Sequence, residues 1–208
     1  DGWLYAAVAG GKVIRIRPDG TGLAEVFSTG GDITGLCFGA DGALYLTDAA
    51  MGGTLAGGGG LLKASFDGWA VSVEPLATTA GGQRLACPMA PVAAADGKVY
   101  FTEYSAVSAA AQKGAKGAVL TDLLAHTGGG SVCVWDPAAG RVSVVAGGIA
   151  GAGGLALSPA GDTLYVSESE NGRVWALPAS LRGGTAEQDG TLLFTGLPAY
   201  PAGLSCAA

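Results

Sequence analysis

Three carboxylate side chains recur at one position of a repeated phrase. Asp48, Glu103 and Glu168 each stand three residues after a tyrosine, and the first copy of the phrase has Val8 there instead. Carboxylates gathered in one place raise one another's pKa unless a cation lies between them. The pattern therefore predicts a cation or amine site, or a general acid/base. The alternative is three separate carboxylates at strand ends that accept hydrogen bonds from backbone donors.

The tyrosines belong to a turn that leads into an aromatic strand. Asp-Gly tolerates positive φ and is typical of hairpin turns. Alternating strands follow, such as 12–16 and 131–135. Four short antiparallel strands per repeat are typical of a β-propeller blade. The four copies of the turn and strand lie at residues 1–5, 41–45, 96–100 and 160–165.

The spacing of the copies predicts an all-β fold. The tyrosines are 40, 55 and 65 residues apart, and a blade needs about 40 to 50 residues. We expect a propeller with six blades in full and about four in this chain, which forms a single domain over residues 1–208. The extra residues predict insertions at 51–60 and 105–130, on one rim around the binding site. The expected blades are 1–30, 31–85, 86–149 and 150–197, and 198–208 begins the next.

The composition excludes several classes of protein. Glycine makes up 38 of 208 residues, which disfavours a helical bundle, and the hydrophobic share of 49% excludes disorder caused by polarity. A net charge of −6 without a basic run argues against a nucleic-acid partner and against an electrostatic membrane anchor. The uncharged run 142–161 contains clustered glycines and a Ser-Pro turn. It is therefore expected to form strands and a loop rather than a membrane span.

The four cysteines do not form a metal-binding pattern. They are widely separated, no C-x-x-C pair occurs, and His126 is the only histidine, so a zinc site is not expected. The cysteines are either free buried thiols or partners in one or two disulfides. These residues are Cys37, Cys87, Cys133 and Cys206.

The four tryptophans are spaced like elements of successive blades. Their expected role is packing between blades rather than stacking on a ligand. No nucleophile signature lies near His126, and it falls in the second insertion, so a surface position is expected. The tryptophans are Trp3, Trp69, Trp135 and Trp175.

Several phrases, in their order and spacing, resemble the strictosidine synthase-like proteins. The resemblance covers most of the chain from about Ile33 onward. These proteins share a six-bladed propeller with the gluconolactonase/regucalcin and paraoxonase families. The resemblance implies a small organic substrate in the central channel, and it slightly favours the secretory pathway over the cytoplasm. The phrases that carry it are VYFTEYS at 99–105, ALSPAG at 156–161, LYVSE at 164–168 and LPAYP at 197–201.

The same resemblance implies a role for Glu168. In strictosidine synthase the catalytic glutamate lies in a phrase that matches 164–168, so Glu168 would act as general acid/base while an amine condenses with an aldehyde. A carboxylate in an apolar channel suits this work, because desolvation raises its pKa toward neutrality. Asp48 and Glu103 would then contact the substrate or a cation in the channel.

The related lactonases hold a divalent metal, usually calcium, through Glu, Asn and Asp side chains. The resemblance places two of these ligand positions at Gly153 and Ala202, which offer no side-chain donor. Calcium takes six to eight oxygen ligands, so each loss matters. We therefore expect no cofactor, and calcium only if Asp48, Glu103 and Glu168 form an altered site.

The sequence is compatible with three functions. The first is a strictosidine synthase-like propeller, a lyase, that acts on a small organic substrate through Glu168. The second is a metal-dependent esterase or lactonase of the gluconolactonase/arylesterase type, in which a metal polarises the carbonyl. The third is a non-catalytic ligand-binding propeller. Whether the protein is an enzyme stays open, and the expected partner is a small molecule.

Overall fold

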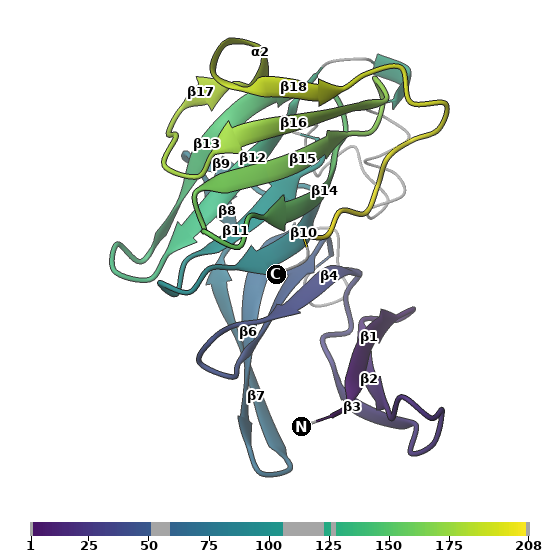
Figure 1. Ribbon diagram of the computed structural model, residues 1–208. Helices are drawn as coiled ribbons and strands as arrows, with labels where there is room; N and C mark the ends of the chain where they lie inside the picture. The colour runs from purple at the N-terminus through teal and green to yellow at the C-terminus, as the bar shows by residue number, and fades with distance from the viewer. Residues whose placement is uncertain (1, 51–58, 106–122, 126–127, 207–208) are drawn as a thin grey trace.

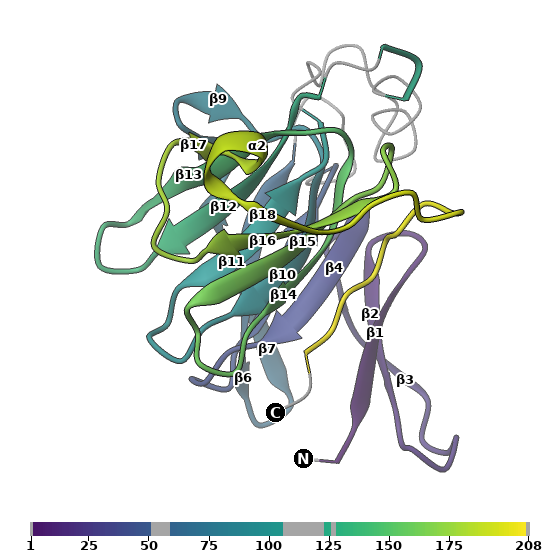
Figure 2. The same ribbon diagram turned by 45° about the horizontal axis from the view of Figure 1, so that its top comes forward.

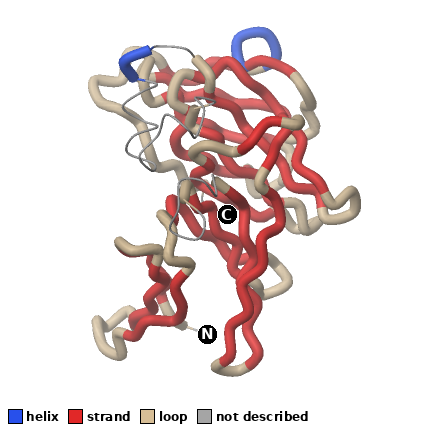
Figure 3. Tube along the Cα trace, turned by 180° about the vertical axis from the view of Figure 1, so that it is seen from behind, coloured by secondary structure: helices blue, strands red, loops and turns tan. Residues whose placement is uncertain are grey.

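Four mainly antiparallel β-sheets make up most of the molecule (Figures 1 and 3). The computed structural model describes residues 2–50, 59–105, 123–125 and 128–206. The sheets follow one another along the chain, as the blades of a propeller do. The prediction of an all-β propeller with about four blades in this chain is confirmed.

The first two blades are built from consecutive strands. Blade 1 has three strands, namely β1 (Leu4–Val8), β2 (Lys12–Ile16) and β3 (Ala24–Ser28). Blade 2 has four, namely β4 (Ile33–Phe38), β5 (Leu44–Asp48), β6 (Gly60–Asp67) and β7 (Ala70–Ala77). A short hairpin of β8 (Thr79–Ala80) and β9 (Gln83–Arg84) follows blade 2.

Blades 3 and 4 are joined by more than packing. Blade 3 contains β10 (Pro88–Ala93), β11 (Val99–Glu103), β12 (Gly130–Asp136) and β13 (Arg141–Ile149). Blade 4 contains β14 (Ala152–Leu157), β15 (Thr163–Glu168), β16 (Arg173–Pro178) and β18 (Thr191–Phe194). Between β16 and β18 the chain returns to blade 3, where β17 (Gly184–Thr185) pairs in parallel with β13 (Figure 2). The short helix α2 (Ala186–Asp189) then leads back to blade 4.

The repeated turns form as expected. The glycine at the second position of each copy has a φ between +75° and +85°, a region that side chains rarely adopt. In Gly42, Gly97 and Gly161 the N–H donates to the carbonyl oxygen three residues earlier, at 3.0, 3.1 and 2.8 Å. Glycine at these positions thus closes the tight turn that starts each tyrosine-bearing strand.

The core lies between neighbouring blades. Val13 of blade 1 packs with leucines of β5, Leu61 of blade 2 packs with Phe101 of blade 3, and further buried residues join blade 3 to blade 4. The innermost strands β4, β10 and β14 contact one another in this order. They form a continuous wall on the axial side of the blades.

Part of the expected rim lies outside the described residues. This applies to most of both insertions, 51–60 and 105–130, and to His126. No helix among the described residues is long and apolar enough to cross a membrane.

The cysteines are free thiols. The sequence left two alternatives open, and the structure has free thiols rather than disulfides at all four cysteines. Cys87 and Cys133 are fully buried. Burial away from water raises the pKa of Cys37 and of Cys133 to about 12, because the thiolate loses its hydration. These thiols therefore behave as small apolar core residues.

Candidate functional site

The three carboxylates end equivalent strands of blades 2, 3 and 4. Each is the last residue of the second strand of its blade, and each lies opposite the first residue of the innermost strand. The register thus confirms that they share one structural position. The opposing pairs are Asp48 with Ile33, Glu103 with Pro88 and Glu168 with Ala152.

Asp48 is fully buried and hydrogen-bonded on both oxygens. Its Oδ1 accepts the backbone N–H groups of Asp32 and Ala50, each at 2.8 Å. Its Oδ2 accepts the hydroxyl of Thr29 at 2.7 Å, from the end of blade 1. The carboxylate therefore ties the loop that enters blade 2 to the blade before it.

Glu103 is buried with only one oxygen hydrogen-bonded. Its Oε1 accepts the backbone N–H groups of Ala86 and Cys87 at 3.1 and 2.6 Å, whereas Oε2 has no well-formed hydrogen bond to a described residue. Desolvation by burial raises the pKa of Glu103 to about 8, although the N–H groups of Cys87, Ala86 and Ser105 oppose the shift. Burial of Glu103 in the folded protein thus favours the protonated, uncharged form of its carboxyl group.

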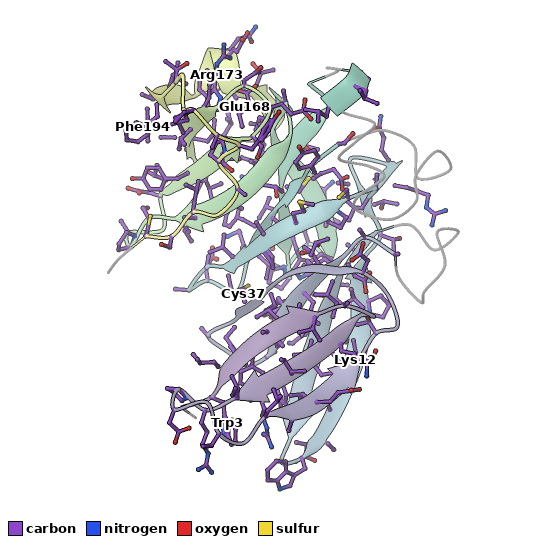
Figure 4. The ribbon with its side chains drawn as sticks, turned by 90° about the vertical axis from the view of Figure 1, so that its right-hand side faces the viewer. Trp3, Lys12, Cys37, Glu168, Arg173 and Phe194 are labelled. Atoms are coloured by element: carbon purple, nitrogen blue, oxygen red, sulfur yellow. The ribbon has the colours of Figure 1, made fainter. Side chains whose placement is uncertain are left out.

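Glu168 is surrounded by donors. Its Oε1 accepts Ala150 N–H at 3.1 Å and Asn171 Nδ2 at 2.7 Å, and its Oε2 accepts Trp175 Nε1 at 2.8 Å. Arg173 Nη1 lies 3.6 Å from Oε2 and adds an ion pair, in the region of blade 4 labelled in Figure 4. Both oxygens are therefore held by neighbouring groups of the protein, and the catalytic role of Glu168 stays a prediction.

The equivalent contacts reveal a common structural role. All three carboxylates accept N–H groups from the loop that precedes the innermost strand of their own blade. Among the described residues, no group of three or more acidic, cysteine or histidine side chains is close enough to hold a metal ion. Asp48, Glu103 and Glu168 are therefore not gathered into one such group, and whether the protein binds a cation stays a prediction.

A row of buried hydroxyls stands beside the carboxylates, and the sequence analysis missed it. The residue before each carboxylate is Thr47, Thr102 or Ser167, and all three are fully buried. The Thr102 hydroxyl donates to the Gly153 carbonyl oxygen at 2.8 Å and so joins blade 3 to blade 4. The Ser167 hydroxyl accepts the N–H of Gly154 at 2.7 Å. The sequence does carry a signal for this row, because a Thr or Ser stands directly before the carboxylate residue in each of the three repeats.

An axial pocket of about 760 Å³ lies on the inner strands. Its walls come from β4, β10 and β14, from Tyr104 and Leu123, and from the segment 200–204, and they are mostly apolar. Asp48, Glu103 and Glu168 are not among the described residues that line it. The apolar and aromatic side chains that line the pocket include Leu36, Met89, Pro91, Tyr104, Leu155, Tyr200 and Leu204.

Both positions that the resemblance assigned to metal ligands line this pocket. Gly153 and Ala202 supply no oxygen-bearing side chain there. A Cβ atom built on Gly153 would lie 2.5 Å from Ser169 Oγ, and one built on Gly154 would lie 2.0 Å from the Ala202 carbonyl oxygen. The segment 200–204 thus packs directly on the glycines of β14.

Comparison with known proteins now gives the family. The model of the SMP-30/Gluconolactonase/LRE-like region matches residues 59–206. The chain therefore belongs to this family of propellers. The strictosidine synthase-like assignment is not confirmed, whereas the wider group that includes gluconolactonase and regucalcin is. A comparison with curated proteins finds no match.

Solved structures agree with the fold. A gluconolactonase from Xanthomonas campestris is 20% identical with a TM-score of 0.71, over 99% of this chain and 63% of its own. A putative gluconolactonase is 20% identical with a TM-score of 0.64, over 98% and 66%. A calcium-binding protein, regucalcin, from Agrobacterium tumefaciens is 15% identical with a TM-score of 0.63, over 99% and 60%. The present chain thus spans less than two thirds of the length of these structures.

Proposed function

We propose that this protein binds a small organic lactone or ester in its axial pocket. The observation that carries the proposal is the apolar pocket of about 760 Å³ on the inner strands. Small-molecule sites are usually concave, mostly apolar and about 300 to 1,000 Å³ in volume. Membership of the gluconolactonase-like family supports a lactone or ester as the chemical class.

The wall of the pocket suits a ligand with an apolar body. Leu36, Met89, Leu155 and Leu204 offer aliphatic surface, and Tyr104 offers an aromatic ring. Removing apolar surface from water is worth about 25 cal/mol per Å². We therefore expect burial of the ligand body to supply most of the affinity.

The hydroxyl groups of the pocket select the polar part of the ligand. Thr34 and Ser169 each donate their proton to a backbone carbonyl oxygen, and the Tyr104 hydroxyl lies 3.4 Å from a carboxylate oxygen of Glu170. A hydroxyl that donates its proton still has lone pairs to accept a hydrogen bond. The pocket should therefore favour a ligand that carries a hydroxyl group beside its lactone or ester.

Metal-dependent hydrolysis of the family type does not fit the described residues. A calcium ion would polarise the carbonyl, but it needs several oxygen ligands, and Gly153 and Ala202 provide none from their side chains. These two residues favour a second candidate function, ligand binding without turnover.

Titration of the complete natural protein with lactones and aryl esters tests the proposal. Binding is followed by calorimetry, and hydrolysis is followed separately in calcium and in chelator. Leu204→Trp fills the pocket and should weaken binding at least tenfold. Leu193→Trp is the matched control, because Leu193 is exposed on β18 and does not line the pocket.

The outcomes separate the candidates. Binding with turnover in chelator supports a metal-independent hydrolase, and binding without turnover supports the second candidate. Turnover that requires calcium would contradict our interpretation of Gly153 and Ala202. Equal binding by the Leu204→Trp and Leu193→Trp variants, or no binding to a correctly folded protein, would overturn the proposal.

A further inference from the structure

A second hollow, the aromatic groove, lies between blades 1 and 2. It has a volume of about 530 Å³, and its walls include Trp3, Tyr5, Arg15, Phe38 and Phe66. The turns β4–β5 and β6–β7 border it, at the opposite ends of the strands from the carboxylates. Figure 4 shows Trp3 at the far end of the molecule from Glu168. The aromatic groove is thus separate from the axial pocket.

Three aromatic rings from two blades form one wall of the groove. Tyr5 of β1 meets Phe38 of β4 edge to face, with ring centroids 5.0 Å apart, and Phe66 of β6 lies 6.3 Å from Tyr5 and 6.4 Å from Phe38. Phe38 remains 46% exposed. Aromatic surface that stays in contact with water at such a hollow can take up the ring of a ligand.

A guanidinium group forms another wall. Arg15 lies opposite Tyr5 in the β1–β2 pair, and its Cζ atom lies 4.7 Å from the ring centroid of Trp3 and 4.4 Å from that of Trp69. Arg17 lies 5.0 Å from the Trp3 ring. Stacking on aromatic rings holds a guanidinium in place and leaves its edge N–H groups for hydrogen bonds.

In the part of the chain that the structure describes, the positive charge of this cluster is not neutralised by an ion pair. Among the described residues, neither Arg15 nor Arg17 forms an ion pair, although acidic residues outnumber basic ones by 17 to 11 in the chain. The nearby carboxylate of Asp41 is instead paired with Lys63 at 2.9 Å. An Arg side chain offers a fork of N–H donors that matches a carboxylate. The charge of the groove therefore complements an organic anion.

The indole of Trp3 packs against groups of its own blade. A Cβ atom built on Gly22 would lie 2.8 Å from the six-membered ring of Trp3, so the backbone at Gly22 packs closely against the indole. Trp69, at the tip of the β6–β7 hairpin, is 82% exposed. The predicted packing of tryptophans between blades is thus limited, for Trp69, to the contact with Arg15 of blade 1, and most of its ring stays in contact with solvent.

We propose that the aromatic groove binds an aromatic carboxylate. The ring of the ligand packs against Phe38 and Tyr5, and its carboxylate accepts N–H groups from Arg15. This site is independent of the proposed function of the axial pocket. The axial pocket does not suit an aromatic carboxylate, because none of its described lining residues has a cationic side chain.

Calorimetry with 2-naphthoate tests the assignment, using the complete protein in low salt. We expect 2-naphthoate to bind at least tenfold more tightly than cyclohexanecarboxylate, which lacks the aromatic ring, and than 2-naphthol, which lacks the charge. Arg15→Gln should weaken 2-naphthoate binding at least tenfold. Arg141→Gln is the matched control, because it removes the same charge from the exposed start of β13 in blade 3.

Two further variants separate the aromatic groove from the axial pocket and provide a substitute for Arg15→Gln. Leu204→Trp should leave 2-naphthoate binding unchanged, because it blocks only the axial pocket. If Arg15→Gln fails to fold, Trp69→Leu replaces it, since an exposed ring can be removed without disturbing the core; it should weaken binding several-fold. Equal loss in Arg15→Gln and Arg141→Gln, no preference for the aromatic anion, or loss of binding in Leu204→Trp would overturn the proposal.

Discussion

Trp175 Nε1 donates a hydrogen bond to Glu168 Oε2 over 2.8 Å, within blade 4. With the other donors around Glu168, this bond makes the carboxylate an anchor of its blade. The residue that resembles a catalytic glutamate thus has a structural task that does not depend on any substrate.

Replacing Glu168 by Gln should destabilise the protein. The amide NH₂ group would face a donor whichever way the side chain turned, and the ion pair with Arg173 would be lost. We expect a loss of about 1 to 3 kcal/mol in the free energy of unfolding, measured in urea. Glu74→Gln, on the exposed part of β7, is the control and should change stability little. Full stability with complete loss of turnover would instead establish the catalytic role.

Glu103 should make stability depend on pH. Its pKa is raised to about 8 in the folded protein, against 4.5 normally, so the folded state binds the proton more tightly. The stabilisation is fully present below pH 4.5 and is lost as the pH rises through 8, with a slope of at most about 1.4 kcal/mol for each pH unit. Glu103→Gln should flatten the dependence of the melting temperature on pH across this range. An unchanged slope would show that Glu103 does not carry this effect.

Gly154→Ala should displace the segment 200–204. The added methyl group would lie 2.0 Å from the Ala202 carbonyl oxygen, which the backbone can avoid only by moving. We expect a cost of about 1 to 3 kcal/mol and weaker binding in the axial pocket. Gly203→Ala is the matched control, because a Cβ there meets nothing within 4 Å although the residue lines the same pocket. Equal effects of the two changes would contradict the packing described here.

Thr102→Val tests the hydroxyl row between blades. The substitution keeps the shape of the side chain but removes the bond to the Gly153 carbonyl oxygen, which is then left buried without this donor. We expect a loss of about 1 to 3 kcal/mol in unfolding free energy. Thr163→Val should cost less, because its hydroxyl bonds to the exposed Asp162. The comparison is made by chemical denaturation of both variants.

Chelator should leave the thermal stability of the protein unchanged. A metal that binds the folded state raises the melting temperature by mass action, and the described residues contain no group of three or more acidic, cysteine or histidine side chains that could hold one. Thermal unfolding in calcium and in chelator checks this directly. A clear increase of the melting temperature in calcium would contradict this prediction.

The sequence predicted those features that have a local cause. Asp-Gly turns need a glycine at positive φ, and the tyrosine-bearing strands that follow Gly42 and Gly97 are where the pattern placed them. The equivalence of Asp48, Glu103 and Glu168 was also visible, because it depends only on register within a repeat.

Features that depend on contacts between distant segments were not predicted. The partners of Glu168, the packing of Ala202 on Gly154 and the contact of Arg15 with Trp69 join residues whose spacing has no periodic signal. The resemblance matched the strand that ends at Glu168, but it contained no information on the donors around that residue.

The return of the chain to blade 3 at β17 has a mechanical consequence. Thr185 pairs with Gly147 of β13, and the residues on either side of this crossing belong to blade 4. Separating blade 4 from blade 3 would therefore break the pairing of β17 with β13. Blades 3 and 4 should open as a single cooperative unit, so that their amide protons exchange with solvent together rather than blade by blade.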